Sequence, residues 1–368
     1  MQDFKQIITK LTPLADVFTS LKKFAEPVAA RDIPVADALG QVLAADINAT
    51  PRPARAMALT DGWAVSAADI ADASGYATVT LDKNAIYLET GDEMPPGTDA
   101  ILPPDAVVVR GSSVEAVASV ASGDGVLAAG GDVGREKPLY VTGQRLRAKD
   151  IGVLEALDIA NISARAPRIL IVSAREDVRL APAVQFIARD CAAQGATPQL
   201  LGDADLEKIL NASTADAVVM VGGTGSGARD VSITALAHAG RVVCHGIGIN
   251  PGQSTAVGIA QGRVVLIVPG RLDAAMAAWL LAGRRLLDLL SGCIDTAAGS
   301  RGRLTRKVTS TIGVCDFVLV REAEGGAIPL GGRHLPLSAL AGSTGYFTVP
   351  PDSEGYAAGS EVAIHRWP

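Results

Sequence analysis

The spacing of apolar residues predicts helices near the start of the chain, followed by short strands. Apolar positions recur at helical intervals over Asp16–Phe24 and Val35–Ile47, and again over Ala148–Ile159. Between these segments, from about residue 55 to residue 132, short β-prone runs alternate with clusters of Gly, Pro and Asp. We therefore expect a discontinuous helical region with a β-rich unit inserted into it.

The middle of the chain has the alternation that is typical of an α/β domain. The expected strands are residues 168–173, 197–201, 216–221 and 264–268, and the expected helices are residues 182–194, 203–211, 231–239 and 272–290. Strands that alternate with helices imply parallel pairing, with helices on both faces of the sheet. Asp230 is expected to be the N-cap of the third helix.

The last part of the chain returns to a β pattern, with strands expected at residues 304–310, 317–321, 346–349 and 361–365. A length of 368 residues fits two to four domains. The expected domains are a discontinuous helical and dimerisation domain (residues 1–47 and 133–166), a β-rich insertion (48–132), an α/β domain (167–295) and a C-terminal β domain (296–368).

Composition narrows the class of protein. A net charge of −6 and an aromatic content of 4% disfavour a protein that binds nucleic acid through a basic surface or through base stacking. The four cysteines form no C-x-x-C pair, which favours reduced thiols. The first ten residues have no apolar signal core, and the apolar stretch Ala274–Gly283 is shorter than the about 20 residues that span a bilayer. We expect a cytoplasmic protein without nucleic-acid or membrane partners.

A glycine-rich segment carries the most specific chemistry. It follows one expected strand and opens the next helix. Glycines let backbone N–H groups turn toward an anion, and a helix N-terminus adds partial positive charge. The expected ligand contacts are Gly222, Gly223, Thr224, Gly225, Ser226, Gly227 and Arg229. We predict an anion site here; the alternative is a flexible turn.

Three further loops are expected at the same edge, because ligands bind where parallel strands end. The candidate contacts in them are Pro251, Gly252 and Ser254 in one loop, Pro269, Gly270 and Arg271 in the second, and Glu176 and Asp177 in the third. The two carboxylates suit Mg²⁺ beside a phosphate. Each loop alone is more typical of an ordinary turn, and their expected convergence favours a site.

Six segments, in order and spacing, resemble the MoeA-type molybdopterin molybdenumtransferases, whose eukaryotic relatives include the gephyrin E domain. The segments are ALGQVLAADI, ALTDGWAV, ETGDEMPPGTDAIL, PRILIVSARED, GINPGQSTAVG and IVPGRLDAA. The loop GGTGSGARD instead resembles the GGTGxxxRD pattern of the related MogA/MoaB adenylyl-transfer proteins. No single segment is specific, whereas six in order are.

The resemblance implies a multidomain α/β fold with a three-layer domain of the MoaB/Mog type and a small C-terminal β-barrel-like domain. It also implies a homodimer with its active cleft between subunits, which inserts molybdate into adenylylated molybdopterin and releases AMP, with Mg²⁺. Asp61, Thr90, Asp177 and Asp230 stand at the family's catalytic positions. Glu176 and Asp177 stand at those of its acidic, metal-binding pair.

Several positions depart from the family pattern. Arg175 replaces a Gly, Gln253 replaces a Lys, and Arg271 replaces an Asn. The loss of the Lys removes a phosphate counter-charge, for which the two arginines can compensate. These departures favour an alternative function, that of a non-catalytic molybdopterin or cofactor carrier, or a chaperone, for a particular molybdoenzyme. Adenylyl transfer of the MogA kind is a third alternative.

Overall fold

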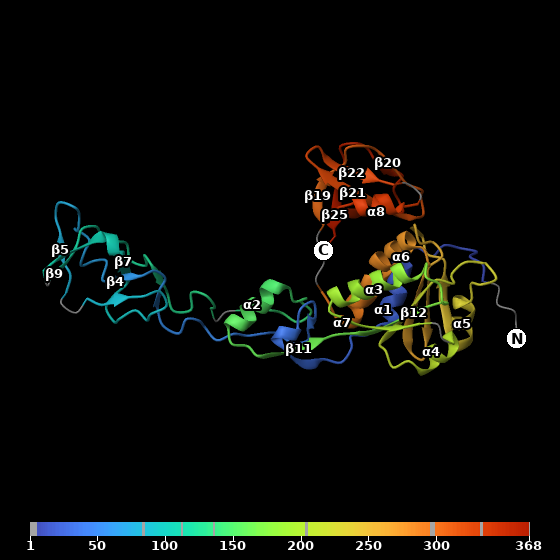
Figure 1. Ribbon diagram of the computed structural model, residues 1–368, viewed down its shortest axis with the longest axis horizontal. Coiled ribbons are helices and arrows are strands. Elements are labelled where there is room, and N and C mark those ends of the chain that lie inside the picture. Colours follow the sequence, from blue (N-terminus) through green and yellow to red (C-terminus); the bar gives the residue numbers. More distant parts are fainter. Residues whose placement is uncertain are drawn as a thin grey trace. The chain divides into compact units, whose positions relative to one another are not determined.

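The computed structural model describes residues 6–82, 85–111, 113–134, 137–202, 205–294, 299–331 and 334–367. The chain forms two compact units, one made of residues 1–45 and 142–368 and the other of residues 46–141 (Figure 1). The second unit is thus one continuous stretch between two parts of the first. The division into four domains stays a prediction, and its boundary at residues 295 and 296 lies outside the described residues.

A six-stranded sheet forms the centre of the larger unit, in the order β13-β12-β14-β18-β17-β15. Its strands are β12 (Arg168–Ser173), β13 (Thr197–Leu201), β14 (Ala217–Val221), β15 (Arg241–His245), β17 (Ala256–Ala260) and β18 (Arg263–Val268). The first four in spatial order run parallel, as predicted. β17 and β15 extend the sheet with antiparallel pairing, which the sequence analysis did not anticipate.

Helices cover both faces of this sheet and make three layers. They are α1 (Leu14–Phe24), α3 (Ala181–Ala193), α4 (Leu206–Ala212), α5 (Ser232–Ala239), α6 (Leu272–Ala278) and α7 (Arg284–Ser291), with a π-helical turn at Trp279–Gly283. Alternate residues along a strand point to opposite faces. Ile169 and Ile171 of β12 therefore pack against α1, α3, α6 and α7, whereas Leu170 and Val172 pack against α4 and α5. The expected three-layer α/β domain is confirmed; the expected helix start at residue 203 lies outside the described residues.

The predicted helix over Val35–Ile47 is wrong. The segment forms a 3₁₀ turn and a strand, β2, which joins a sheet in the order β1-β11-β2. The elements are the turn Val35–Asp37, β1 (Arg31–Pro34), β2 (Val42–Leu43) and β11 (Asn161–Arg165). Gly40 lies between them at φ +78°, a left-handed conformation that ends a helix. Its carbonyl accepts a hydrogen bond of 2.9 Å from Arg145, so the chain reverses here. The helix expected after residue 148 is confirmed as α2 (Ala148–Ala156).

The C-terminal part of the chain forms an open β-sheet, as its β pattern predicts. Its strands follow the order β16-β21-β23-β25-β19, with β22 beside β21, and this order does not close into a barrel over the described residues. The elements are β16 (Ile249–Asn250), β19 (Ser300–Arg303), β20 (Val308–Thr309), β21 (Cys315–Ala323), β22 (Gly326–Leu330), α8 (Leu337–Gly342), β23 (Gly345–Val349), β24 (Gly355–Tyr356) and β25 (Glu361–Arg366). β16 belongs to a loop of the α/β domain, so this sheet and that loop are joined by backbone pairing.

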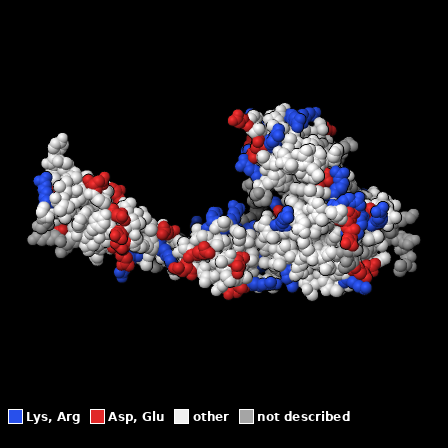
Figure 2. Space-filling model, viewed as in Figure 1, with Lys and Arg blue, Asp and Glu red and all other residues white. Residues whose placement is uncertain are grey.

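Residues 46–141 form a unit of short strands, as the sequence predicts. The elements are β3 (Met57–Ala58), β4 (Gly62–Val65), β5 (Val79–Thr80), β6 (Tyr87–Leu88), β7 (Ala100–Leu102), a 3₁₀ turn (Pro104–Ala106), β8 (Val107–Arg110), β9 (Ser113–Ala116) and β10 (Val126–Leu127). This unit contains 14 acidic and six basic residues, so it carries a net charge of −8 and the rest of the chain +2. Figure 2 shows the excess of acidic side chains on its visible face.

None of the described helices is long and apolar enough to cross a membrane.

A buried ion pair connects the helices on one face of the large sheet. Arg284 of α7 donates from Nε to the Asp190 carboxylate of α3 at 2.9 Å, and Trp279 donates to the same oxygen at 2.7 Å. Tyr346 of the C-terminal sheet stacks on His365, with 5.1 Å between the ring centres. Burial and then the charge of Arg284 lower the pKa of His365 below its usual 6.5.

His365 is expected to make the free energy of unfolding depend on pH. Because the unfolded chain binds the proton more readily, this residue destabilises the fold as the pH falls through 6.5 toward the lowered pKa. His365→Phe keeps an aromatic ring and should remove this part of the pH dependence, measured by urea unfolding between about pH 5 and about pH 8. The exposed His238→Phe is the control, and an unchanged slope in His365→Phe would contradict the assignment.

Candidate functional site

Three loops leave the large sheet at one edge. β14 pairs in parallel with β12 on one side and with β18 on the other. The hydrogen-bond ladder continues past the strands, since the Ala174 N–H donates to Val221 at 2.9 Å and the Gly222 N–H donates to Val268 at 2.8 Å. The loops that begin at Ala174, Gly222 and Pro269 therefore lie side by side, as the sequence analysis expected.

The start of the glycine-rich loop requires glycine. Gly222 and Gly223 have φ values of +92° and +69°, which side chains disfavour. A Cβ on Gly223 would lie 2.3 Å from the hydroxyl of Ser232. That hydroxyl is fully buried and donates to the Gly222 carbonyl at 2.8 Å. The turn is therefore fixed from the side of helix α5.

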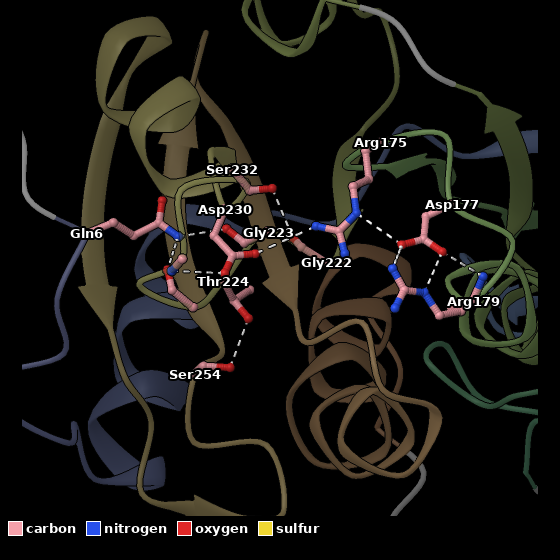
Figure 3. A network of polar contacts seen from close by, with 12 residues as sticks. Gln6, Arg175, Asp177, Arg179, Gly222, Gly223, Thr224, Asp230, Ser232 and Ser254 are labelled. Atoms are coloured by element: carbon pink, nitrogen blue, oxygen red, sulfur yellow. Dashed lines mark hydrogen bonds and ion pairs between the residues drawn. The ribbon is translucent and has the colours of Figure 1, made fainter.

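Gln6 holds the other side of the same loop. Its side-chain amide donates to the carbonyls of Gly223 at 2.8 Å and Gly225 at 2.5 Å (Figure 3). In a trans peptide the C=O and the following N–H point in opposite directions, so the N–H groups of Thr224 and Ser226 point away from Gln6. Over the described part of the chain, the backbone N–H groups of residues 223–226 have no protein acceptor. Successive N–H groups of this kind next to a helix N-terminus form a site for an anion.

A hydroxyl pair joins this loop to the loop at residues 246–254. The Thr224 side chain is 4% exposed, and its Oγ1 lies 2.8 Å from Oγ of Ser254. In the second loop, Thr255 donates to the Gly252 carbonyl at 2.6 Å, and Asn250 donates to Asp316 of β21 at 2.7 Å. The structure therefore brings Thr224 and the predicted contacts Pro251, Gly252 and Ser254 into one region.

The tip of the glycine-rich loop is exposed, and Asp230 is not a helix cap. Ser226, Gly227 and Arg229 are exposed. Helix α5 begins at Ser232 and has no side-chain cap, so the expected N-cap at Asp230 is wrong. The carboxylate instead turns back into the loop, where it accepts from the Gly227 N–H at 3.3 Å and lies 3.9 Å from Arg175.

Asp177 is surrounded by arginine donors. Its Oδ1 accepts from the backbone N–H of Arg179 at 3.0 Å and from Nε at 2.9 Å. Its Oδ2 accepts from Nη2 of Arg179 at 2.7 Å and from Nε of Arg175 at 3.1 Å. These bonds, the Arg179 side chain first, hold the pKa of Asp177 far below its usual value. The carboxylate is therefore ionised and fully used by protein donors.

The residues of this loop do not fit a Mg²⁺ ion. A carboxylate has about four acceptor positions, and those of Asp177 are occupied by cationic or N–H donors. Glu176 is exposed beside it. Within the described ranges, no three His, Cys, Asp or Glu side chains are grouped so that they could hold a metal ion.

The third loop is closed by an ion pair. Arg271 donates to Asp273 at 3.1 and 2.9 Å, and Asp273 also accepts from the Leu335 N–H at 3.2 Å. Burial alone would raise the pKa of Asp273, but these donors outweigh it and lower the pKa. A Cβ on Gly270 would lie 2.4 Å from the side chain of Leu180. Arg271 is 68% exposed at its side chain and so keeps free N–H groups for a ligand.

A cavity of about 960 Å³ opens beside the 246–254 loop, between it and the C-terminal sheet. Its polar lining includes Asn250, Gln253, Arg306, Lys307, Thr309, Ser310, Thr311 and Asp316. The Ser310 hydroxyl is buried and has no hydrogen-bond partner among the described residues. Two cations against one carboxylate give the lining a positive balance. Sequence reasoning missed this cavity, because its two sides come from segments far apart in the chain.

In the smaller unit, Asp61 and Thr90 contact each other directly. The Thr90 backbone N–H and hydroxyl both donate to Oδ1 of Asp61, at 2.7 and 2.8 Å. These bonds, the backbone one first, lower the pKa of Asp61. Asp61 and Thr90, which the sequence places in separate segments, thus form one exposed pair in which the Asp61 carboxylate is ionised.

Comparisons with known proteins agree with this architecture. Residues 5–157 match the sequence model of the MoeA N-terminal region, domains I and II. Residues 185–288 match a model described as a probable molybdopterin binding domain. Over residues 5–157 the chain is similar to the MoeA family.

This MoeA-like chain aligns over nearly its whole length with archaeal proteins. One from Methanocaldococcus jannaschii, provisionally named a molybdopterin biosynthesis protein, is 24% identical over an alignment of 403 positions. The alignment covers 98% of this chain and 99% of that one. The crystal structure of the molybdopterin biosynthesis MoeA protein from Pyrococcus horikoshii has a TM-score of 0.77 at 23% identity and covers 97% and 100% of the two chains. A molybdenum cofactor biosynthesis protein from Pyrococcus furiosus has a TM-score of 0.62 at 21% identity, with the same coverage. These structures share the fold.

Gln6→Glu is expected to destabilise the fold of this chain. The carboxylate is nearly isosteric but cannot donate to the Gly223 and Gly225 carbonyls, which lose these hydrogen bonds and face a negative charge. Loss of such bonds lowers the free energy of unfolding by about 1–3 kcal/mol, measurable by urea unfolding. Ile7→Ala, at an exposed neighbour, is the control. Equal stability of Gln6→Glu and the wild type would show that these bonds do not hold the loop.

Proposed function

We propose that this chain inserts molybdate into adenylylated molybdopterin and releases AMP, as a cytoplasmic homodimer. The observation that supports this most strongly is the run of backbone N–H groups at residues 223–226 beside the N-terminus of α5, which suits a phosphate group. Gly222–Gly227 and Arg229 are proposed to hold the pterin phosphate. Pro251, Gly252 and Ser254, together with Pro269, Gly270 and Arg271, are proposed to line the adjoining walls.

The cavity beside the 246–254 loop supports molybdate as the second substrate. Molybdate is a tetrahedral dianion, and it is stabilised by cations and by hydrogen-bond donors. Arg306 and Lys307 supply positive charge, and the buried hydroxyl of Ser310 is a donor that has no partner within the described ranges. We propose that molybdate binds here, next to the pterin site.

Asp61 is proposed to act at the phosphate–phosphate bond. Its lowered pKa keeps it ionised at neutral pH, so it is a poor proton acceptor and a good hydrogen-bond acceptor. We propose that Thr90 orients this carboxylate and that the carboxylate orients the attacking oxygen. Asp177 and Asp230, which the resemblance identifies with catalytic positions, are proposed to position Arg175 and the loop amide of Gly227.

The use of Asp177 by two arginines favours a second candidate function. A carboxylate that is saturated by protein donors is not available for chemistry on a ligand. A chain that keeps the phosphate site but has lost this carboxylate could bind molybdopterin, or the finished cofactor, without turnover. It would then serve as a carrier or chaperone for a molybdoenzyme.

An assay of AMP release from adenylylated molybdopterin and molybdate separates the two functions. We expect the full chain to release AMP. Asp61→Ala should slow the release about 100-fold or more and leave molybdopterin binding unchanged, because the residue acts on the reaction and not on the phosphate site.

Asp72→Ala removes an exposed carboxylate from the same unit and is the matched control. Tight molybdopterin binding without AMP release would favour the carrier, and absence of binding would reject both functions. Normal turnover in Asp61→Ala would reject the role given to Asp61.

A further inference from the structure

In the 173–179 loop, the guanidinium group of Arg175 lies beside Asp177, where the resemblance to the MoeA family predicts a divalent cation. Arg175 lies between two carboxylates: it donates to Asp177 from Nε at 3.1 Å, and its Nη1 is 3.9 Å from Asp230 of the glycine-rich loop (Figure 3). Ser173 donates to the Arg175 carbonyl at 2.7 Å and fixes the backbone at the same point. The guanidinium group thus connects the loop after β12 with the loop after β14.

Arg179 completes the arrangement from the other side. Its backbone N–H, Nε and Nη2 all donate to Asp177, so three N–H groups of Arg179 bind one carboxylate. The Asp177 side chain is only 9% exposed, whereas Arg175 is 35% exposed. A cation that reached Asp177 would have to displace both arginines and would meet their positive charge. Mg²⁺ also requires near-octahedral oxygen ligands at about 2.1 Å, and Asp177 has no free carboxylate lone pair to offer it.

Arg175 itself keeps donors for a ligand. Its Nε is used by Asp177, but its distance to Asp230 is that of an ion pair and exceeds a hydrogen bond. The terminal N–H groups of Arg175 therefore remain available next to the free backbone N–H groups of the glycine-rich loop. A planar guanidinium group matches the geometry of phosphate oxygens.

We propose that Arg175, held in place by Asp177 and Arg179, supplies the positive charge that faces the phosphate end of the ligand, and that this chain recruits no divalent cation at the 173–179 loop. The proposal rests on the proposed function, in which the glycine-rich loop holds the pterin phosphate. It makes Arg175 a ligand-binding residue and Asp177 and Arg179 positioning residues, in contrast to the metal pair that the sequence suggests.

Metal binding is tested first, without any pterin. Mn²⁺ is titrated into the full chain and followed by its electron paramagnetic resonance signal. The wild type should have no Mn²⁺ site at Asp177, so Asp177→Asn should leave its Mn²⁺ titration unchanged. The double variant Arg175→Ala/Arg179→Ala frees the carboxylate and should gain such a site, which Asp177→Asn then abolishes in the same background. Cooperative thermal unfolding confirms that each variant is folded.

Ligand binding is tested second, with molybdopterin as the probe. The affinity of the wild type should change less than twofold between buffer with Mg²⁺ and buffer with EDTA. Arg175→Ala should weaken binding about tenfold or more, the loss expected for a charge-assisted hydrogen bond. Arg189→Ala removes an exposed arginine from α3 and should leave the affinity unchanged.

Each outcome decides the proposal. A Mn²⁺ site in the wild type that needs Asp177, a strong dependence of binding on Mg²⁺, or unchanged affinity in Arg175→Ala would overturn it. Failure of the double variant to gain Mn²⁺ would also overturn it, since the arginines would then not be what excludes the metal. If the wild type binds no molybdopterin, the proposed function fails, while the Mn²⁺ result still decides whether the loop excludes a cation.

Discussion

The parallel pairing of β14 with β12 and β18 is the constraint on which the site depends. All five residues of β14 are buried, and apolar clusters on both faces of the sheet fix its position. Because three neighbouring parallel strands end at one edge, the loops that follow them start side by side. The backbone hydrogen bonds from Ala174 to Val221 and from Gly222 to Val268 extend the parallel pairing into the first residues of the loops. Loops with few apolar residues thereby acquire fixed positions from the strands that precede them.

The loops at this edge balance most of their side-chain charges internally. Arg175, Asp177 and Arg179 form one group, and Arg271 and Asp273 form another. Among the residues that the structure describes, the backbone N–H groups at 223–226 have no protein acceptor. An anion that enters the site therefore meets dipoles and half-used guanidinium groups that are already oriented, and little reorganisation is needed to bind it. The acidic balance of the chain lies instead in residues 46–141.

The sequence was most informative where one local pattern determines one element. The apolar runs of β12, β14 and β18 and the periodic helices between them predicted the parallel core. β17 was missed because Gly258 interrupts its apolar run; the glycine is needed there because a Cβ would lie 2.6 Å from the backbone carbonyl oxygen of Arg241. The false helix at residues 35–47 has a helical pattern, but the left-handed Gly40 decides its conformation.

The site could be predicted only as a set of loops. The glycine-rich segment and its neighbours follow from strand order, so the sequence could place them together. The role of Gln6 could not be predicted, since it contacts Gly223 from 217 residues away. The residues Arg175, Asp177 and Arg179 were visible, but their chemistry depends on which way each side chain turns. The sequence assigns Glu176 and Asp177 to a metal site, whereas the hydrogen bonds from Arg175 and Arg179 occupy the Asp177 carboxylate.

We propose that the backbone of the glycine-rich loop binds the phosphate of the ligand. Amide hydrogen exchange of the full chain, with and without molybdopterin, is the measurement that bears on this binding, because bound phosphate oxygens would accept from amides that have no acceptor in the described part of the chain. We expect slower exchange at residues 223–226 when molybdopterin is bound. Unchanged exchange at these amides, with protection confined to other parts of the chain, would contradict it.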